Sequence, residues 1–219
     1  MSFMKYFLLP VLIVAFATSS SAQNEKFVKA MEALVPAVDT TRSPEGLNEL
    51  ANSFERIANA EKTQWLPFYY AALCHINIAN LYFQQQKTDQ IDIVMDKAEP
   101  LVNAAAALQK DNSEIMLLKK MFNTGKMMAD PMNRYMTFGM DAQASLETAK
   151  SLDARNPRVY LMEGIDKYFT PEQFGGSKVE GRKLFEEADR LFGEFRPASS
   201  IHPDWGRPMV KYFLAEASK

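Results

Sequence analysis

Apolar residues recur at spacings of three and four along almost the whole chain, which is the periodicity of amphipathic α-helices. No segment alternates apolar and polar residues between hairpin turns, so the pattern predicts an all-α protein. Helices are expected, with ends accurate to about two to four residues, over 24–38, 43–60, 63–86, 88–109, 112–129, 138–153, 156–169, 177–195 and 204–217.

Capping residues mark the starts of several of these helices. Ser43-Pro44 and Asn156-Pro157 each place an N-cap residue before a proline at the first helical position. Asp111-x-x-Glu114 and Ser177-x-x-Glu180 have the spacing of a capping box, in which two side chains satisfy free amides of the first turn. The chain is therefore divided into short helices joined by turns.

An internal repeat appears when the second helices of the predicted hairpins are aligned. Each copy has a small or apolar residue, a bulky residue four positions later and a further residue three positions after that. The copies are Ala98, Val102 and Ala105; Ala142, Leu146 and Ala149; Gly181, Phe185 and Ala188; and, more weakly, Leu50, Phe54 and Ile57. Small side chains at this spacing let one helix pack closely against the next.

The chain resembles the tetratricopeptide repeat family, most clearly over residues 142–192. Tyr160 takes the place of the family's tryptophan, Gly164 that of its small residue, and the Gly181 copy matches the second helix. Glu163 stands where leucine is usual, and an inserted loop lengthens the period by about five residues.

This resemblance implies antiparallel helical hairpins stacked as a right-handed superhelix, with about four repeats and a C-terminal capping helix. Four short segments also resemble a group of exported tetratricopeptide-like proteins of Bacteroidetes-type bacteria. This second resemblance implies no particular chemistry. They are Asp130-Pro131-Met132-Asn133-Arg134, Asn156-Pro157-Arg158, Phe174-Gly175-Gly176 and Pro203-Asp204-Trp205-Gly206.

The N-terminus reads as a secretory signal peptide over residues 1–22. Lys5 precedes an apolar run that is shorter than the roughly 20 residues of a membrane span, and Ser20-x-Ala22 fits a signal peptidase site. Cleavage is expected before Gln23, which leaves residues 23–219 as one helical-repeat domain, soluble and periplasmic, without a membrane span.

Composition narrows the class of partner. Without Lys5 the chain has 24 cationic and 27 acidic residues, dispersed without long blocks of one sign, so nucleic acid is not an expected partner. The single cysteine, Cys74, excludes an internal disulfide, so the hydrophobic core must hold the fold.

No pattern of catalytic residues is present, and the chain is predicted not to be an enzyme. It has no H-E-x-x-H, G-x-S-x-G, phosphate-binding loop or C-x-x-C sequence, and its two histidines are His75 and His202. Cys74 and His75 are helix neighbours that point about 100° apart, so a buried thiol beside a solvated or hydrogen-bonded imidazole is expected. The Gly175-Gly176-Ser177-Lys178 segment is interpreted as a turn in preference to an anion site.

Methionine is concentrated in one segment. Seven of the 13 methionines lie between residues 116 and 140, and Met128, Met132, Met136 and Met140 are spaced at four. Thioethers suit Cu(I), but Pro131 and Gly139 are expected to break the helix that would align them. Flexible packing beneath an irregular loop is the favoured role, so no cofactor and no metal site is predicted.

Two functions remain open. The first is a non-enzymatic exported scaffold or adaptor that binds a protein or peptide in the groove of the solenoid. The second is a periplasmic ligand-binding or ligand-relay protein with a pocket for a small apolar ligand, remotely similar to the tetratricopeptide components associated with TRAP transporters. A continuous apolar cavity would favour the second function, and a polar, open groove would favour the first.

Candidate residues follow from the resemblance, because first helices usually line the concave face of such arrays. The partner-binding candidates are Tyr69, Asn77, Lys119, Asn123, Glu163 and Lys167. The helix-packing candidates are Ala98, Ala105, Ala142, Ala149, Tyr160, Gly164, Gly181, Phe185 and Ala188. Tyr69 is the expected aromatic anchor of the contact surface.

Overall fold

A computed structural model describes residues 25–217, and within that range every regular element is a helix, which confirms the all-α prediction. The predicted signal peptide lies outside the described residues. The elements after the helical segment 25–32 are α2 (Val35–Val38), α3 (Pro44–Ala60), α4 (Trp65–Gln84), η1 (Thr88–Gln90), α5 (Ile91–Leu108), α6 (Ser113–Ala129), α7 (Pro131–Arg134), η2 (Tyr135–Gly139), α8 (Met140–Leu152), α9 (Pro157–Phe169), η3 (Glu172–Phe174), α10 (Lys178–Glu194) and α11 (Arg207–Glu216).

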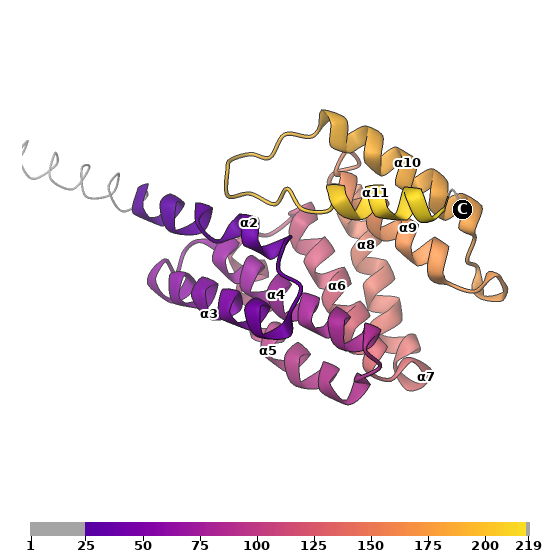
Figure 1. The fold of residues 1–219 in the computed structure, drawn as a ribbon, viewed down its shortest axis with the longest axis horizontal. Helices are drawn as coiled ribbons and strands as arrows, with labels where there is room; N and C mark the ends of the chain where they lie inside the picture. Colours follow the sequence, from indigo (N-terminus) through magenta and orange to yellow (C-terminus); the bar gives the residue numbers. More distant parts are fainter. Residues whose placement is uncertain (1–24, 218–219) are drawn as a thin grey trace, which may run out of the picture.

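The helices pair as neighbours along the chain (Figure 1). α3 packs on α4, α4 on α5, α6 on α8 and α9 on α10, while α11 covers α10 at the C-terminal end. Short connections force consecutive helices to run antiparallel. In the part of the chain that the structure describes, no helix is both long and apolar enough to cross a bilayer.

Side-chain caps begin five of the ten α-helices α2 to α11. Ser43, Asn156 and Ser177 each accept a hydrogen bond from an amide of the first turn, as predicted from the sequence. The start of α6 differs by one residue, because Asn112 is the N-cap and Asp111 adopts a positive φ of 51°.

The segment 131–139 corrects the sequence analysis, which placed the next helix start at residue 138. Asp130 caps α7, and Pro131 occupies the first helical position, where its missing N–H costs nothing. α7 continues through the π-helical turn η2 into α8 without a gap. The helix is interrupted before Pro131, because α6 ends at Ala129 and Asp130 is not in a helical conformation, as expected. The expectation that Gly139 breaks it is wrong, since η2 runs through Gly139 into α8.

The residues of the internal repeat lie between neighbouring helices. Gly164 and Gly181 face each other at the α9–α10 crossing, where a Cβ on Gly164 would lie 3.3 Å from the Gly181 carbonyl oxygen and 2.6 Å from the Phe185 ring. Tyr160 is partly buried. The other helix-packing candidates, all buried, are Ala98, Ala105, Ala142, Ala149, Phe185 and Ala188.

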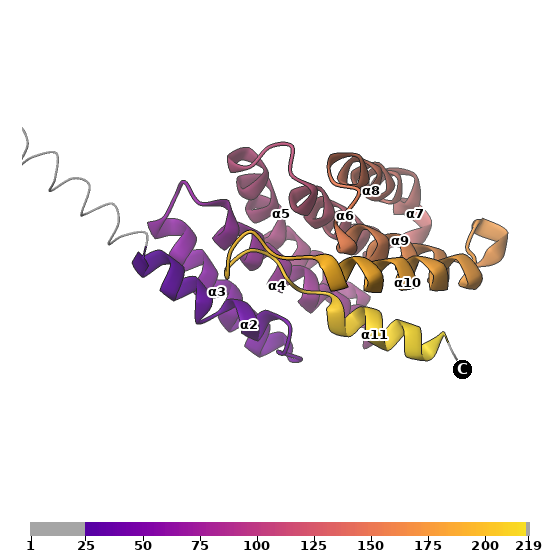
Figure 2. The ribbon, with the colours of Figure 1, turned by 90° about the horizontal axis from the view of Figure 1, so that it is seen from above.

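A long irregular segment, the C-terminal loop (residues 195–206), connects α10 to α11. Figure 2 shows it running back from α10 toward α2 and α3 before it returns to α11. Ser200 Oγ donates to Glu32 Oε1 at 2.6 Å, and the Tyr70 hydroxyl donates to the carbonyl of Ile201 at 3.1 Å. The loop thus joins the last part of the fold to the first.

Candidate functional site

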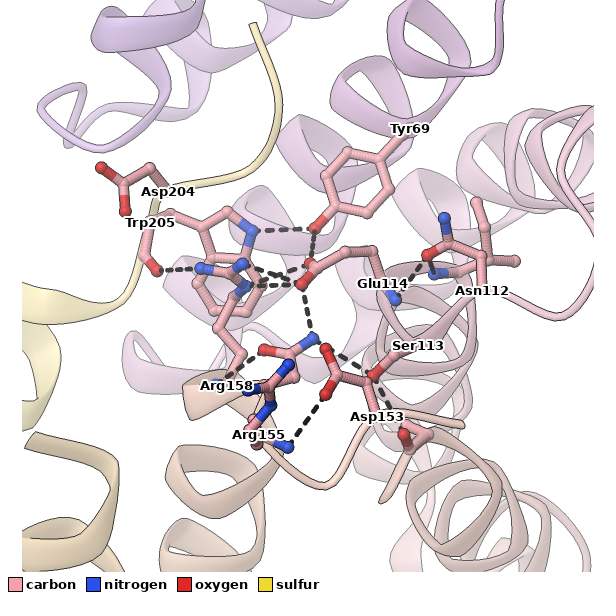
Figure 3. A network of polar contacts seen from close by, with 12 residues as sticks. Tyr69, Asn112, Ser113, Glu114, Asp153, Arg155, Arg158, Asp204 and Trp205 are labelled. Carbon is pink, nitrogen blue, oxygen red and sulfur yellow. Dashed lines mark hydrogen bonds and ion pairs between the residues drawn. The ribbon is translucent and has the colours of Figure 1, made fainter. Parts of the chain in front are cut away.

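A buried polar network holds the C-terminal loop against three helices (Figure 3). Arg158 on α9 is fully buried, and its Nε donates to both carboxylate oxygens of Glu114 on α6, at 2.9 and 3.0 Å. Its Nη1 donates to the Trp205 carbonyl at 3.2 Å. Trp205 Nε1 donates to the Tyr69 hydroxyl at 2.8 Å, and that hydroxyl donates to Glu114 at 3.2 Å.

The members of this network bond to one another, which gives it a structural role. Asn156 Nδ2 adds a hydrogen bond of 2.6 Å to Glu114, and the Arg158 guanidinium lies 4.6 Å from the centre of the Phe195 ring. A buried ion pair of this kind is supported by additional hydrogen bonds that offset the loss of hydration. Its consequence for function is that Trp205 is held in a fixed orientation.

Trp205 forms one wall of a cavity, the α2–loop pocket, which has a volume of about 280 Å³. Its lining is mainly apolar and aromatic, with two carboxylates and two further polar groups. The lining residues are Val35, Pro36, Val38, Asp39, Tyr70, Pro197, Ser200, His202, Asp204 and Trp205. Pockets with an apolar lining and a few placed polar groups are the usual form of small-molecule sites.

His202 is the lining residue that can donate or accept a hydrogen bond or bind a metal, depending on its protonation. Its Nδ1 lies 2.7 Å from Ser199 Oγ, and its ring packs edge-on against Trp65 at 5.9 Å. In the tautomer with the proton on Nδ1, that nitrogen donates to Ser199 and Nε2 presents a lone pair. Burial lowers the pKa of His202, which favours this neutral, metal-binding form near neutral pH.

The carboxyl groups of the pocket shape its electrostatics. Burial raises the pKa of Asp39, while the nearby Arg42 acts in the opposite direction. Asp204 adds a second carboxyl group to the lining of the same pocket. Anionic groups of a ligand are therefore expected to point away from this side and toward solvent.

A second cavity, of about 390 Å³, lies between α3, α4 and α5 and is more polar. Its lining residues are Asn48, Asn52, Glu55, His75, Lys97, Pro100 and Leu101. His75 is buried, and neither ring nitrogen has a hydrogen-bond partner: Nε2 lies 3.5 Å from Glu55 Oε1, without hydrogen-bond geometry. The His75 imidazole therefore makes no hydrogen bond to another described residue, and it lines this cavity opposite Glu55. Cys74 beside it is buried as expected.

We expect stability to fall when the pH drops below the ordinary histidine pKa of 6.5, since both histidines have lowered pKa values in the fold. For His75 the cause is burial, which Glu55 partly opposes. The unfolded chain then binds more protons than the native state, so the stabilisation is complete above the unfolded pKa and is lost as pH falls toward the folded pKa. Urea unfolding at about pH 7.5 and pH 5 measures the change.

His75→Phe keeps an aromatic ring but removes the titrating group, and it should flatten this pH dependence. A slope between these two pH values that is unchanged in His75→Phe would contradict the assignment to His75.

The six partner-binding residues predicted from the sequence lie in different environments in the structure. Tyr69 is completely buried, so the prediction that it anchors an exposed surface is wrong: its ring packs in the core and its hydroxyl joins the Figure 3 network. Glu163 forms an ion pair with Lys150 at 2.7 Å, and Lys167 donates to the Gly175 carbonyl. Asn77, Lys119 and Asn123 are partly exposed. None of these six residues lines the α2–loop pocket.

The residues that do line this pocket have little local signal in the sequence. In the sequence, the Pro203-Asp204-Trp205-Gly206 segment carries only a resemblance to exported proteins, and His202 is one of two histidines. Their single local signal is a histidine and a tryptophan in a turn-rich segment. The contact with α2 depends on residues more than 100 positions away, which no local pattern reports.

Metal-binding groups of the usual kinds are sparse. Among the described residues, no three side chains of the His, Cys, Asp and Glu types gather to hold an ion.

Comparison with known proteins gives one informative similarity. The chain matches no protein-family model and no curated protein sequence. It is similar to a solved structure of the HusA haemophore from Porphyromonas gingivalis, with a TM-score of 0.76 and 28% sequence identity. The match covers 87% of this chain and 92% of that chain.

Proposed function

We propose that this protein is an exported ligand-binding protein whose ligand is a haem or a related porphyrin. The observation that carries the proposal is the similarity to a haemophore along nearly the whole of both chains. Of the two functions left open by the sequence, this similarity favours the ligand-binding protein over the protein-binding scaffold. As a carrier, the protein would bind and release its ligand without chemical change.

The α2–loop pocket is the proposed binding site. Val35, Pro36 and Pro197 expose apolar surface that a flat apolar ring can contact, and the small exposed parts of Tyr70 and Trp205 add aromatic atoms. The pocket volume of about 280 Å³ is slightly below the roughly 300–1,000 Å³ of enclosing sites. It therefore takes one edge of a porphyrin and leaves the rest against the surface.

The polar groups of the pocket set the orientation of that ligand. Asp39 and Asp204 repel carboxylates, so the apolar edge of a haem enters and its propionates face solvent. His202 is the residue that would ligate the iron through Nε2, with Ser199 holding the ring by its Nδ1. The bound metal supplies an additional bond that a metal-free porphyrin lacks.

Titration with haem and with metal-free protoporphyrin tests this proposal. The parent protein should bind both, and haem should show the absorbance change of an iron bound to imidazole. His202→Ala should weaken haem binding by at least about tenfold and leave protoporphyrin binding nearly unchanged, because only the iron bond is lost.

His75→Phe is the matched control, since His75 lies in the other cavity and should not affect either titration. Failure of the parent protein to bind either porphyrin would overturn the proposed function. Equal haem binding and an unchanged spectrum in His202→Ala would remove His202 from the iron site.

A further inference from the structure

The seven methionines between residues 116 and 140 fall into two groups. Met116, Met121 and Met128 pack against the core, and the Met127 sulfur lies over Gly139 of η2. These four fit the gap-filling role predicted from the sequence. The remaining three, Met132, Met136 and Met140, are 93%, 76% and 47% exposed, and they do not fill gaps in the core.

These three exposed methionines lie along one continuous helix. α7, η2 and α8 follow one another without a gap, and each contributes one of the three side chains. Positions four apart on a helix place their Cβ atoms about 5–6 Å from each other. A flexible thioether side chain can span half of that distance, so neighbouring sulfurs can reach a common point.

The π turn η2 brings the three exposed methionines closer to one line along the helix. In an uninterrupted α-helix, residues eight positions apart differ by about 80° around the axis. In η2 the Met140 amide donates to the Tyr135 carbonyl, a five-residue hydrogen bond that widens the turn. Each residue of η2 therefore turns the chain around the helix axis by less than in an α-helix. This reduces the angle of about 80° between Met132 and Met140.

The cations Lys126 and Arg134, on α6 and α7, are paired with carboxylates. Arg134 pairs with Asp92 at 2.7 Å, and Lys126 pairs with Asp92 and Asp96 at 3.1 and 2.8 Å. The strongest soft donor of the chain, Cys74, is buried, and burial raises the pKa of its thiol to about 12. A thioether does not need to lose a proton before it binds, unlike a thiol.

We propose that Met132, Met136 and Met140 form a surface site for one Cu(I) ion, bound through two or three thioether sulfurs. Thioethers are soft, neutral donors that select Cu(I) over Zn²⁺, Mg²⁺ and Ca²⁺. The site lies away from the α2–loop pocket, since α7 and α2 are well separated in both Figure 1 and Figure 2. It is independent of the proposed porphyrin binding.

Competition with a coloured Cu(I) chelator, under ascorbate and without haem, tests the site. The parent protein should withdraw one equivalent of Cu(I). The triple variant Met132→Leu/Met136→Leu/Met140→Leu keeps apolar volume and helix propensity but removes the sulfurs. It should bind Cu(I) more weakly by a factor on the order of ten or more, with an unchanged circular dichroism spectrum.

Two controls separate this site from other soft donors. Met209→Leu removes a methionine that is 41% exposed on α11 and should not change the affinity, and Cys74→Ala should also leave it unchanged. In protein with isotope-labelled methionine methyl groups, Cu(I) should shift the NMR signals of Met132, Met136 and Met140. Cu(I) binding that persists in the triple variant, or no binding by the parent protein, would overturn the proposal.

Discussion

Replacing Arg158 with methionine is expected to destabilise the fold by about 3–5 kcal/mol, the usual cost of breaking a buried ion pair from one side. The Glu114 carboxylate is largely buried and loses its bidentate partner, while the Trp205 carbonyl loses a donor. Urea unfolding monitored by circular dichroism gives the change in the free energy of unfolding.

The double variant Arg158→Met/Glu114→Leu provides the control. It removes both charges, so the penalty of a lone buried carboxylate disappears, although Tyr69 and Asn156 still lose an acceptor. The double variant is expected to be more stable than Arg158→Met by about 1–2 kcal/mol. If it were less stable than the single variant, the unpaired charge would not be the cause of the loss.

Gly164→Leu is the second substitution with a large expected effect, a destabilisation of at least about 1–3 kcal/mol from overpacking. A Cβ at this position would already lie 2.6 Å from the Phe185 ring and 3.3 Å from the Gly181 carbonyl oxygen. The rest of a leucine side chain would have to push α9 and α10 apart. The melting temperature reports the effect.

Gly193 on α10 offers a matched control, because no atom lies within 4 Å of a Cβ built there. Gly193→Leu should keep or raise the melting temperature, since leucine favours a helix more than glycine does. Equal melting temperatures for Gly164→Leu and the parent protein would show that the α9–α10 crossing adapts to a large side chain.

Local patterns predicted the helices and the close α9–α10 crossing well. Apolar spacing and capping residues are properties of neighbouring positions, so Ser43, Asn156 and Ser177 identify helix starts directly. The helix at 131–139 was missed because proline was taken as a breaker, whereas an N-cap one residue earlier makes it a helix starter.

Local patterns could not predict the residues of the candidate site. Tyr69 looks like an exposed aromatic anchor in the sequence because nothing local shows that Trp205 and Glu114 enclose its hydroxyl. His202 and Trp205 become pocket residues only after the C-terminal loop has crossed to α2 and α4. Contacts of this kind join positions 131 to 168 residues apart.

That loop crossing has a consequence for how the chain folds. A linear stack of hairpins gains stability from nearest neighbours, so its ends can unravel separately. Here Ser200 bonds to Glu32 and Trp205 to Tyr69, so unravelling at one end removes contacts at the other. Such long-range contacts raise the contact order, which slows folding relative to a stack of local hairpins. They also make unfolding more cooperative, so proteases should find few partly opened states between the native and unfolded chains.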